Sequence, residues 1–414
     1  MRKTIALFVL TLVICSCVSA TPIAVAEGEA DRFESWNETD FLKDFVSNNL
    51  DRTVATAGEE KAGDYVLSVL EKMGYTTRKD NGLTSAKQRF DYVDSINGDA
   101  NVGYNIVARK DVSGATEFVI IGCHYDNLTS YELNGEKVGG EGAGEATGVA
   151  VMLKLAYDLR YETLPFNVVF VAFGGNQLGL YGAEKFIGAN QSIVDNTLLM
   201  LNLDSVGVGD YLYMYADEVS TKHEDFVYDL SEKLNLDVRK PPKDKKIVAA
   251  KIRDDSKLPY HHKGLLSENS LFLDYGVNTL NLFGYNWTGE GYGGESENHP
   301  DIVGTKRDTL SNYLAYYSES GQKKMETATA LVKAAVTAED FSAVMKESKK
   351  EKFDYSWLVS DKVRIGVSLG ILAVLAAAAA LVYVKLDKIQ KNSKKAEDKS
   401  DDFQKQSEKV FEDF

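Results

Sequence analysis

The chain has 414 residues, of which 44% are hydrophobic, and a formal net charge of −15. This apolar content is typical of a globular protein and argues against a largely disordered chain. The acidic balance argues against nucleic acid as a partner, because phosphate binding needs clustered lysines and arginines.

The first 26 residues have the pattern of a secretory signal peptide. Arg2 and Lys3 precede a short apolar run over residues 5–13, and small residues ending at Ala20 or at Ala26 fit a cleavage site. The run is too short to span a membrane. We therefore expect export from the cytoplasm.

The cysteines agree with this expectation. Cys15 and Cys17 would leave with the leader, so only Cys123 would remain and no internal disulfide could form. Residues 14–17 also loosely resemble a lipoprotein cleavage box with Cys17 as the acylated residue. That interpretation is the weaker one, because a lipid anchor would duplicate the carboxyl-terminal helix described below.

Helical and strand-like segments then alternate along the chain. Apolar residues at helical spacing predict helices over 53–75 and 145–161. Strand-like patterns cover 104–109 and 118–122, and continuous apolar runs, typical of strands buried on both faces, cover 166–173, 198–203 and 279–283. The order predicts an α/β fold, a three-layer sandwich around a mixed, largely parallel central sheet. Functional groups in such folds gather beyond the carboxyl ends of the strands.

Four motifs lie at those strand ends. They are Gly-Cys-His-Tyr-Asp over 122–126, Gly-Ala-Gly-Glu-Ala-Thr-Gly over 142–148, a segment over 170–180 that contains Gly-Gly-Asn-Gln-Leu-Gly-Leu, and Asn-Leu-Asp-Ser-Val-Gly over 202–207. Together they resemble the di-zinc aminopeptidases of metallopeptidase clan MH, whose patterns are G-x-H-x-D, G-A-D-D-N-A-S-G, F-x-x-F-x-x-E-E-x-G-L and N-x-D-x-x-G. The order and spacing match over roughly residues 45 to 335. The resemblance implies a zinc-peptidase-like domain.

Three residues that serve the first zinc in the family have counterparts in this sequence. His124 matches the first histidine ligand, Asp126 matches the carboxylate that orients that ring, and Asp204 matches the terminal carboxylate of the same zinc. The bridging aspartate falls on Ala143 or Gly144, and neither has a side chain that binds metal.

The residues that the family uses to bind the second zinc and to act as catalytic base are replaced in this sequence. The catalytic glutamate falls on Asn176 and the neighbouring ligand glutamate on Gln177. An amide accepts no proton at neutral pH, and losing a general base costs about 10²–10⁴ in rate. The last histidine position falls on Gly304, four residues before Asp308, while His299 lies nearby but displaced.

The resemblance therefore implies that no catalytic residue is expected and that no cofactor is bound, with zinc present only if the site is rescued. Glu141 or Glu145 is the candidate for such a rescue, although Glu145 should point away if it opens the helix over 145–161. A weak structural metal at His124 and Asp204 is a second alternative.

The segment after the last strand carries the candidate ligand contacts. Residues 284–294 contain Tyr285, Trp287 and Tyr292 among glycines, which suits a ligand cleft. A mobile loop with partly packed rings is an equally good interpretation of the same pattern.

A second apolar run, residues 365–384, carries no charge and is long enough, at roughly 30 Å, to cross a membrane. Lysines follow it, which predicts a cytoplasmic tail. We thus divide the chain into a signal peptide (1–26), a zinc aminopeptidase-like extracytoplasmic domain (27–340), a juxtamembrane stalk (341–362), a transmembrane helix (363–385) and a charged tail (386–414).

Function follows from the combination of motifs and anchor. We expect a single-pass protein of the cell membrane whose domain is catalytically inactive and binds a peptide or protein ligand, or serves in a membrane complex. The alternative is an active surface aminopeptidase, a metal-dependent peptide hydrolase with a divergent site.

Overall fold

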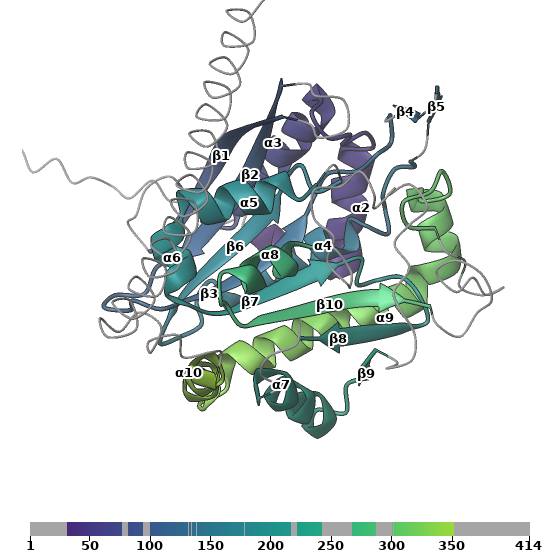
Figure 1. Ribbon diagram of the computed structural model, residues 1–414. Coiled ribbons are helices and arrows are strands. Elements are labelled where there is room, and N and C mark those ends of the chain that lie inside the picture. The colour runs from purple at the N-terminus through teal and green to yellow at the C-terminus, as the bar shows by residue number, and fades with distance from the viewer. Residues whose placement is uncertain are drawn as a thin grey trace, which may run out of the picture. The chain divides into compact units, whose positions relative to one another are not determined.

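An eight-stranded sheet forms the centre of the described domain (Figure 1). Its strand order is β1-β2-β6-β3-β7-β10-β8-β9. The strands are β1 (Leu83–Val93), β2 (Ala100–Lys110), β3 (Phe118–His124), β6 (Asn167–Phe173), β7 (Thr197–Asp204), β8 (Tyr211–Tyr215), β9 (Val238–Arg239) and β10 (Thr279–Tyr285). The computed structural model describes residues 31–76, 82–93, 100–130, 132–133, 135–137, 139–177, 179–216, 222–241, 267–286, 300 and 302–351.

The sheet is mixed, with a parallel centre. The pairs β6–β3, β3–β7 and β7–β10 are parallel, and so is the short pair β8–β9. The pairs β1–β2, β2–β6 and β8–β10 are antiparallel. The predicted α/β class and mixed sheet are therefore confirmed.

Helices cover both faces of the sheet, as Figure 1 shows. One core includes apolar side chains of α2, α3, α4, α7, α9 and α10, and a second core on the other face includes those of α5, α6 and α8. Alternate residues of β6 enter the two cores, Phe170 in the first and Val171 in the second. The helical elements are η1 (Asp31–Phe33), α2 (Glu38–Asn48), α3 (Ala57–Lys72), α4 (Thr147–Leu159), α5 (Tyr181–Ala189), α6 (Gln191–Asp195), α7 (Lys222–Lys233), α8 (Glu268–Asp274), α9 (Leu310–Thr337) and α10 (Phe341–Glu351); β4 (Glu132–Leu133) and β5 (Glu136–Lys137) form a separate small hairpin.

Two predicted helices begin later than expected. The helix predicted over 53–75 is α3, which begins at Ala57 because the Thr56 side chain accepts the backbone N–H groups of Gly58 and Glu59. The helix predicted over 145–161 is α4, which begins at Thr147 after a turn. In both cases the first residues of the predicted range lie before the helix, in a turn.

The last described helix, α10, is fastened to the sheet. Phe341 and Met345 are fully buried in the first core. His223 of α7 lies with Nδ1 2.7 Å from the Ser348 hydroxyl, and the ammonium of Lys349 donates to the carbonyl of Thr197, at the start of β7. The packed part of the chain therefore continues past residue 340, into the range 341–362 that was predicted to be a juxtamembrane stalk.

The predicted signal peptide, the transmembrane range 363–385 and the tail lie outside the described residues. Among the helices that the structure does describe, none is both long and apolar enough to cross a membrane.

Candidate functional site

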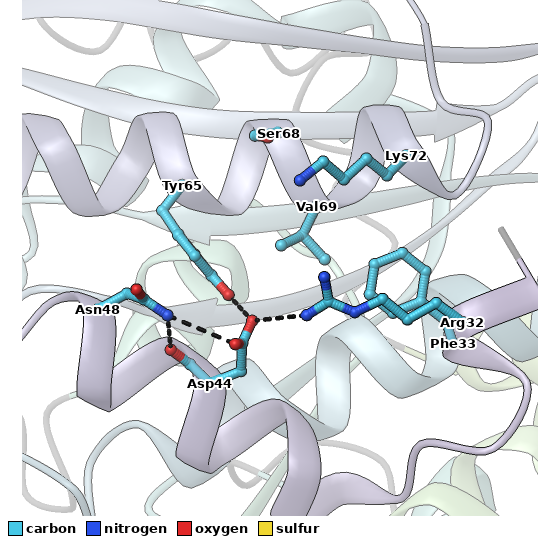
Figure 2. A pocket seen from close by; sticks show the side chains of 8 residues that line it. All are labelled: Arg32, Phe33, Asp44, Asn48, Tyr65, Ser68, Val69 and Lys72. Carbon is cyan, nitrogen blue, oxygen red and sulfur yellow. Dashed lines mark hydrogen bonds and ion pairs between the residues drawn. The ribbon is translucent and has the colours of Figure 1, made fainter. Parts of the chain in front are cut away.

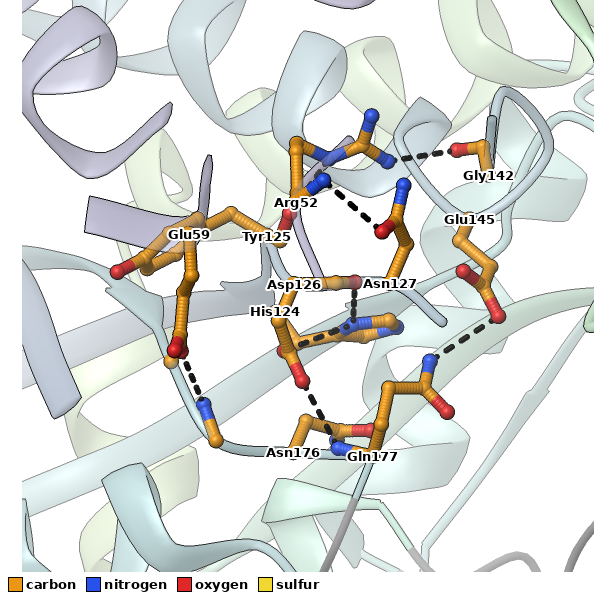
Figure 3. Close-up of polar contacts among 12 residues, drawn as sticks. Arg52, Glu59, His124, Tyr125, Asp126, Asn127, Gly142, Glu145, Asn176 and Gln177 are labelled. Atoms are coloured by element: carbon orange, nitrogen blue, oxygen red, sulfur yellow. Dashed lines mark hydrogen bonds and ion pairs between the residues drawn. The ribbon is translucent and has the colours of Figure 1, made fainter. Parts of the chain in front are cut away.

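The carboxyl ends of three adjacent strands bring the predicted site residues to one edge of the sheet. Figure 3 shows His124, Asp126, Asn176 and Gln177 there. His124 is the last residue of β3 and Asp204 the last of β7, while Asn176 and Gln177 follow β6 by three and four residues. Because β3 lies between β6 and β7 and runs parallel to both, these ends meet at one edge of the sheet.

His124 lies between two carboxylates. Its Nδ1 is 3.5 Å from Asp126 Oδ1, and its Nε2 is 3.7 Å from Asp204 Oδ1. Burial disfavours the imidazolium, but the two carboxylates outweigh it, so the pKa of His124 lies well above its ordinary value. Asp126 is fully buried, and its Oδ2 accepts the backbone N–H of Gln177 at 2.9 Å. The three residues assigned to the first zinc are thus brought together.

The two amides at the second metal position are each paired with a carboxylate. Asn176 Nδ2 donates to Glu268 Oε1 at 2.6 Å, and Gln177 Nε2 donates to Glu145 Oε1 at 3.0 Å. All four side chains are buried. An amide donor facing a carboxylate satisfies both groups without a metal ion.

A serine hydroxyl connects the two halves of the site. Ser267 Oγ lies 2.9 Å from Asp204 Oδ2 and 2.9 Å from Glu268 Oε2, and it accepts from Asn202 Nδ2 at 2.7 Å. The hydroxyl has one proton, so it donates to one carboxylate at a time. Burial, which outweighs the attraction of His124, raises the pKa of Glu268.

The turn before α4, where the bridging aspartate of the family falls on Ala143 or Gly144, makes backbone contacts. Ala143 is fully buried, and the N–H of Gly144 donates to Asp308 Oδ1 at 2.7 Å. Glu145 was expected to point away only if it opened the helix, and it does not, because α4 begins at Thr147. The preceding turn instead directs the Glu145 carboxylate to Gln177.

The other rescue candidate has a different role. Glu141 Oε2 accepts the backbone N–H of Leu310 at 2.8 Å, at the first residue of α9. A carboxylate there stabilises the helix amino terminus. Gly304 lies in a turn with φ 66°, a conformation that favours glycine.

Three supporting residues were not predicted from the sequence: Glu268, Glu59 and Arg52. Glu59 Oε1 accepts the N–H of Gly175 at 2.8 Å, and burial together with Asp126 raises the pKa of Glu59 to about 8. The Arg52 guanidinium, fully buried, donates to backbone carbonyls that include Tyr125 and Gly142. Of the three, Glu268 has a sequence signal, because residues 267–272 (Ser-Glu-Asn-Ser-Leu-Phe) lie where the di-zinc aminopeptidases have the pattern S-D-H-x-P-F.

Of the remaining candidate residues, the structure describes Tyr285. His299, Trp287 and Tyr292 are outside the described residues. Tyr285 ends β10 half-buried, with its ring 6.3 Å from that of Phe283. A ligand cleft at these aromatic residues stays a prediction.

Residues 105–316, about half of the chain, match the sequence profile of Peptidase family M28. The chain belongs to this family. The resemblance to zinc aminopeptidases stated from the motifs is therefore confirmed at the level of the family.

Individual relatives agree with the family assignment. The alkaline phosphatase isozyme conversion protein of Escherichia coli (strain K12) is 30% identical over 175 residues, which are 39% of this chain and 48% of that protein. A probable zinc metalloprotease of Pyrenophora tritici-repentis is 29% identical over 107 residues, 26% of this chain and 25% of that protein. The chain thus spans about half or less of the length of these curated relatives.

Solved structures share the fold of this M28 domain. BSAP, a zinc aminopeptidase from Bacillus subtilis, covers 73% of this chain with 96% of its own at a TM-score of 0.54 and 15% identity. A glutaminyl cyclase from Porphyromonas gingivalis covers 74% of this chain with 98% of its own at a TM-score of 0.51 and 16% identity. At these identities the likeness shows the fold alone.

The described residues do not fit the two-zinc centre that the family implies. A catalytic zinc takes three protein ligands, and the side chains of His124 and Asp204 are two. Asn176 and Gln177 direct amide hydrogens at carboxylates, and Gly144 offers only its backbone. Within the described ranges, no group of three His, Cys, Asp or Glu residues is arranged to hold a metal ion.

Proposed function

We propose that this M28 protein is a membrane-anchored, extracytoplasmic binding module whose peptidase-like domain does not hydrolyse peptides. Its ligand would be a peptide or another protein, either free or within a membrane complex. The acidic net charge of −15 makes nucleic acid an unsuitable partner.

One observation carries the proposal: the buried pair of Asn176 and Glu268. The base position of the family motif holds an amide whose N–H donates, at 2.6 Å, to a carboxylate from another part of the chain. Asn176 cannot remove a proton from water at neutral pH. One N–H of its amide is also already committed to Glu268 inside the protein.

The second amide pair supports the same conclusion independently. Carboxylates gathered without a metal repel one another and lose hydration. The family has a glutamate at the position of Gln177, so here the contact holds one carboxylate, Glu145, in place of two. The Gln177 amide donates to that carboxylate. Such a contact stabilises the site as a metal-free structure.

The alternative, an active aminopeptidase with a divergent site, is favoured by one feature. His124 Nε2 and Asp204 Oδ1 remain 3.7 Å apart, close enough to share one ion. Metal content and turnover distinguish the two functions.

The full-length protein, purified in detergent without chelators, is the material for that measurement. We expect substoichiometric zinc by elemental analysis and no hydrolysis of aminoacyl chromogenic substrates, with or without added zinc. His124→Ala serves as the matched variant. Stoichiometric zinc, together with turnover that His124→Ala abolishes, would overturn the proposal and establish the aminopeptidase.

Anchoring is tested separately. The full chain should stay with the membrane fraction at alkaline pH, and a chain ending at residue 362 should be released. Release of the full chain, or retention of the shortened one, would contradict a carboxyl-terminal anchor.

A further inference from the structure

A crevice of about 240 Å³ lies between η1, α2 and α3, and it shares no residue with the site described above (Figure 2). It is lined by Arg32, Phe33, Asp44, Asn48, Tyr65, Ser68, Val69 and Lys72. Two of these residues are cationic and one is anionic, in a chain whose overall charge is −15. The local excess of positive charge therefore runs against the composition of the protein.

The cationic groups have unused hydrogen-bond donors. Lys72 is half-buried, and within the described part of the chain its ammonium has no hydrogen bond or ion pair, nor does the hydroxyl of Ser68 have a hydrogen bond. Arg32 makes one ion pair, at 3.6 Å from Asp44 Oδ2. A guanidinium and an ammonium provide eight N–H donors, so the crevice is rich in donors that seek an acceptor.

Aromatic rings hold the guanidinium in place. The Arg32 guanidinium carbon lies 4.4 Å from the ring centre of Trp36 and 5.6 Å from that of Phe33. Such stacking limits the motion of the side chain without using its N–H groups. Part of the ordering needed to bind a ligand is therefore already present.

The acceptor side of the crevice is occupied. The Asp44 carboxylate accepts the hydroxyl of Tyr65 and lies within 3.4 Å of Asn48 Nδ2, besides its contact with Arg32. Asp44 is thus directed at its neighbours, while Arg32 and Lys72 are left to face an incoming group. A ligand with acceptor atoms suits this lining better than one with donors.

The geometry points to a small monocarboxylate with a short aliphatic group as the ligand of this crevice. The lining has two cations and one anion, so a ligand with a single negative charge balances it. A dianionic phosphate would leave an excess of negative charge beside Asp44. The carboxylate would accept from Arg32 and Lys72. The aliphatic group would contact Val69 and Phe33, the apolar part of the lining. The carboxylate can belong to a free short-chain acid or to the carboxyl terminus of a peptide.

The test uses the full-length protein in detergent and ligand-observed NMR titration. The probes are isovalerate, its neutral isostere isovaleramide, inorganic phosphate, and an N-acetylated valine tripeptide with a free or an amidated terminus. We expect saturable binding of isovalerate with Kd on the order of 1 mM, and no saturable binding of isovaleramide or of the amidated peptide. Binding of the free-terminus peptide in addition, at least as tight, identifies a peptide terminus as the source; binding of isovalerate alone identifies a free acid.

Variants connect the binding to the crevice. Arg32→Gln and Lys72→Gln should each weaken binding about tenfold. Lys43→Gln removes an exposed lysine of α2 that does not line the crevice, so it should leave binding unchanged. Circular dichroism checks that each variant is folded. Equal binding of isovaleramide, tighter binding of phosphate, or a titration that neither crevice variant alters would overturn the inference.

Discussion

Lys324 of α9 should make the stability of the domain depend on pH in the alkaline range. Its ammonium is 8% exposed and donates to the carbonyl of Gly209 at 3.0 Å, in the turn that follows β7. Burial lowers the pKa of Lys324 to about 8. The unfolded chain therefore binds more protons than the folded chain between pH 8 and the unfolded pKa of about 10.4, and the stability rises with pH there.

The size of the effect follows from the two pKa values. The charged ammonium costs about 3 kcal/mol of stability at pH 7 and about 2 kcal/mol at pH 9, a change of about 1 kcal/mol. In Lys324→Met this dependence is absent, although the variant also loses the hydrogen bond to Gly209. The free energy of unfolding of the wild type minus that of Lys324→Met should thus increase by about 1 kcal/mol from pH 7 to pH 9.

Urea unfolding of the full-length protein in detergent, followed by far-ultraviolet circular dichroism, measures this difference. Lys323→Met is the matched control, because Lys323 is the neighbouring exposed residue of the same helix and should show no such change. A difference that stays constant between the two pH values, or that decreases, would refute the account of Lys324.

Three further substitutions test the packing around the site by the same unfolding measurement. Arg52→Met leaves several buried carbonyls without a donor and should cost about 4 kcal/mol or more; a loss below about 1 kcal/mol would contradict its role. Gly148→Ala places a Cβ 2.2 Å from the carbonyl oxygen of Leu203 and should cost about 3 kcal/mol, since that oxygen belongs to the buried backbone of β7 and cannot move aside. Gly188→Ala in α5 meets open space and should instead stabilise by about 0.5–1 kcal/mol, so equal effects at the two glycines would disprove the packing argument.

Much of the fold was predictable because the central strands are apolar on both faces. The runs over 166–173, 198–203 and 279–283 became β6, β7 and β10 with shifts of at most two residues. Helix starts were less accurate, because they depend on single side chains. Ala55 adopts φ 62° and Thr56 caps α3, and neither feature produces a periodic pattern of apolar residues in the sequence.

The site was predictable only where its residues lie in continuous motifs. His124 and Asp204 end strands and could be placed by strand order. Glu268 pairs with Asn176 across 92 residues, and Arg52 reaches carbonyls up to 90 residues away. No local pattern reports such contacts, so the partners that satisfy the amides emerged from the structure.

The contacts of α10 determine at which end of the parallel strands the described chain finishes. Lys349 contacts the chain at Asp195 and Thr197, beside the amino ends of the parallel strands, whereas His124 lies at their carboxyl ends. The end of α10, near Glu351, therefore lies closer to the amino ends of the parallel strands than to the carboxyl ends that carry His124.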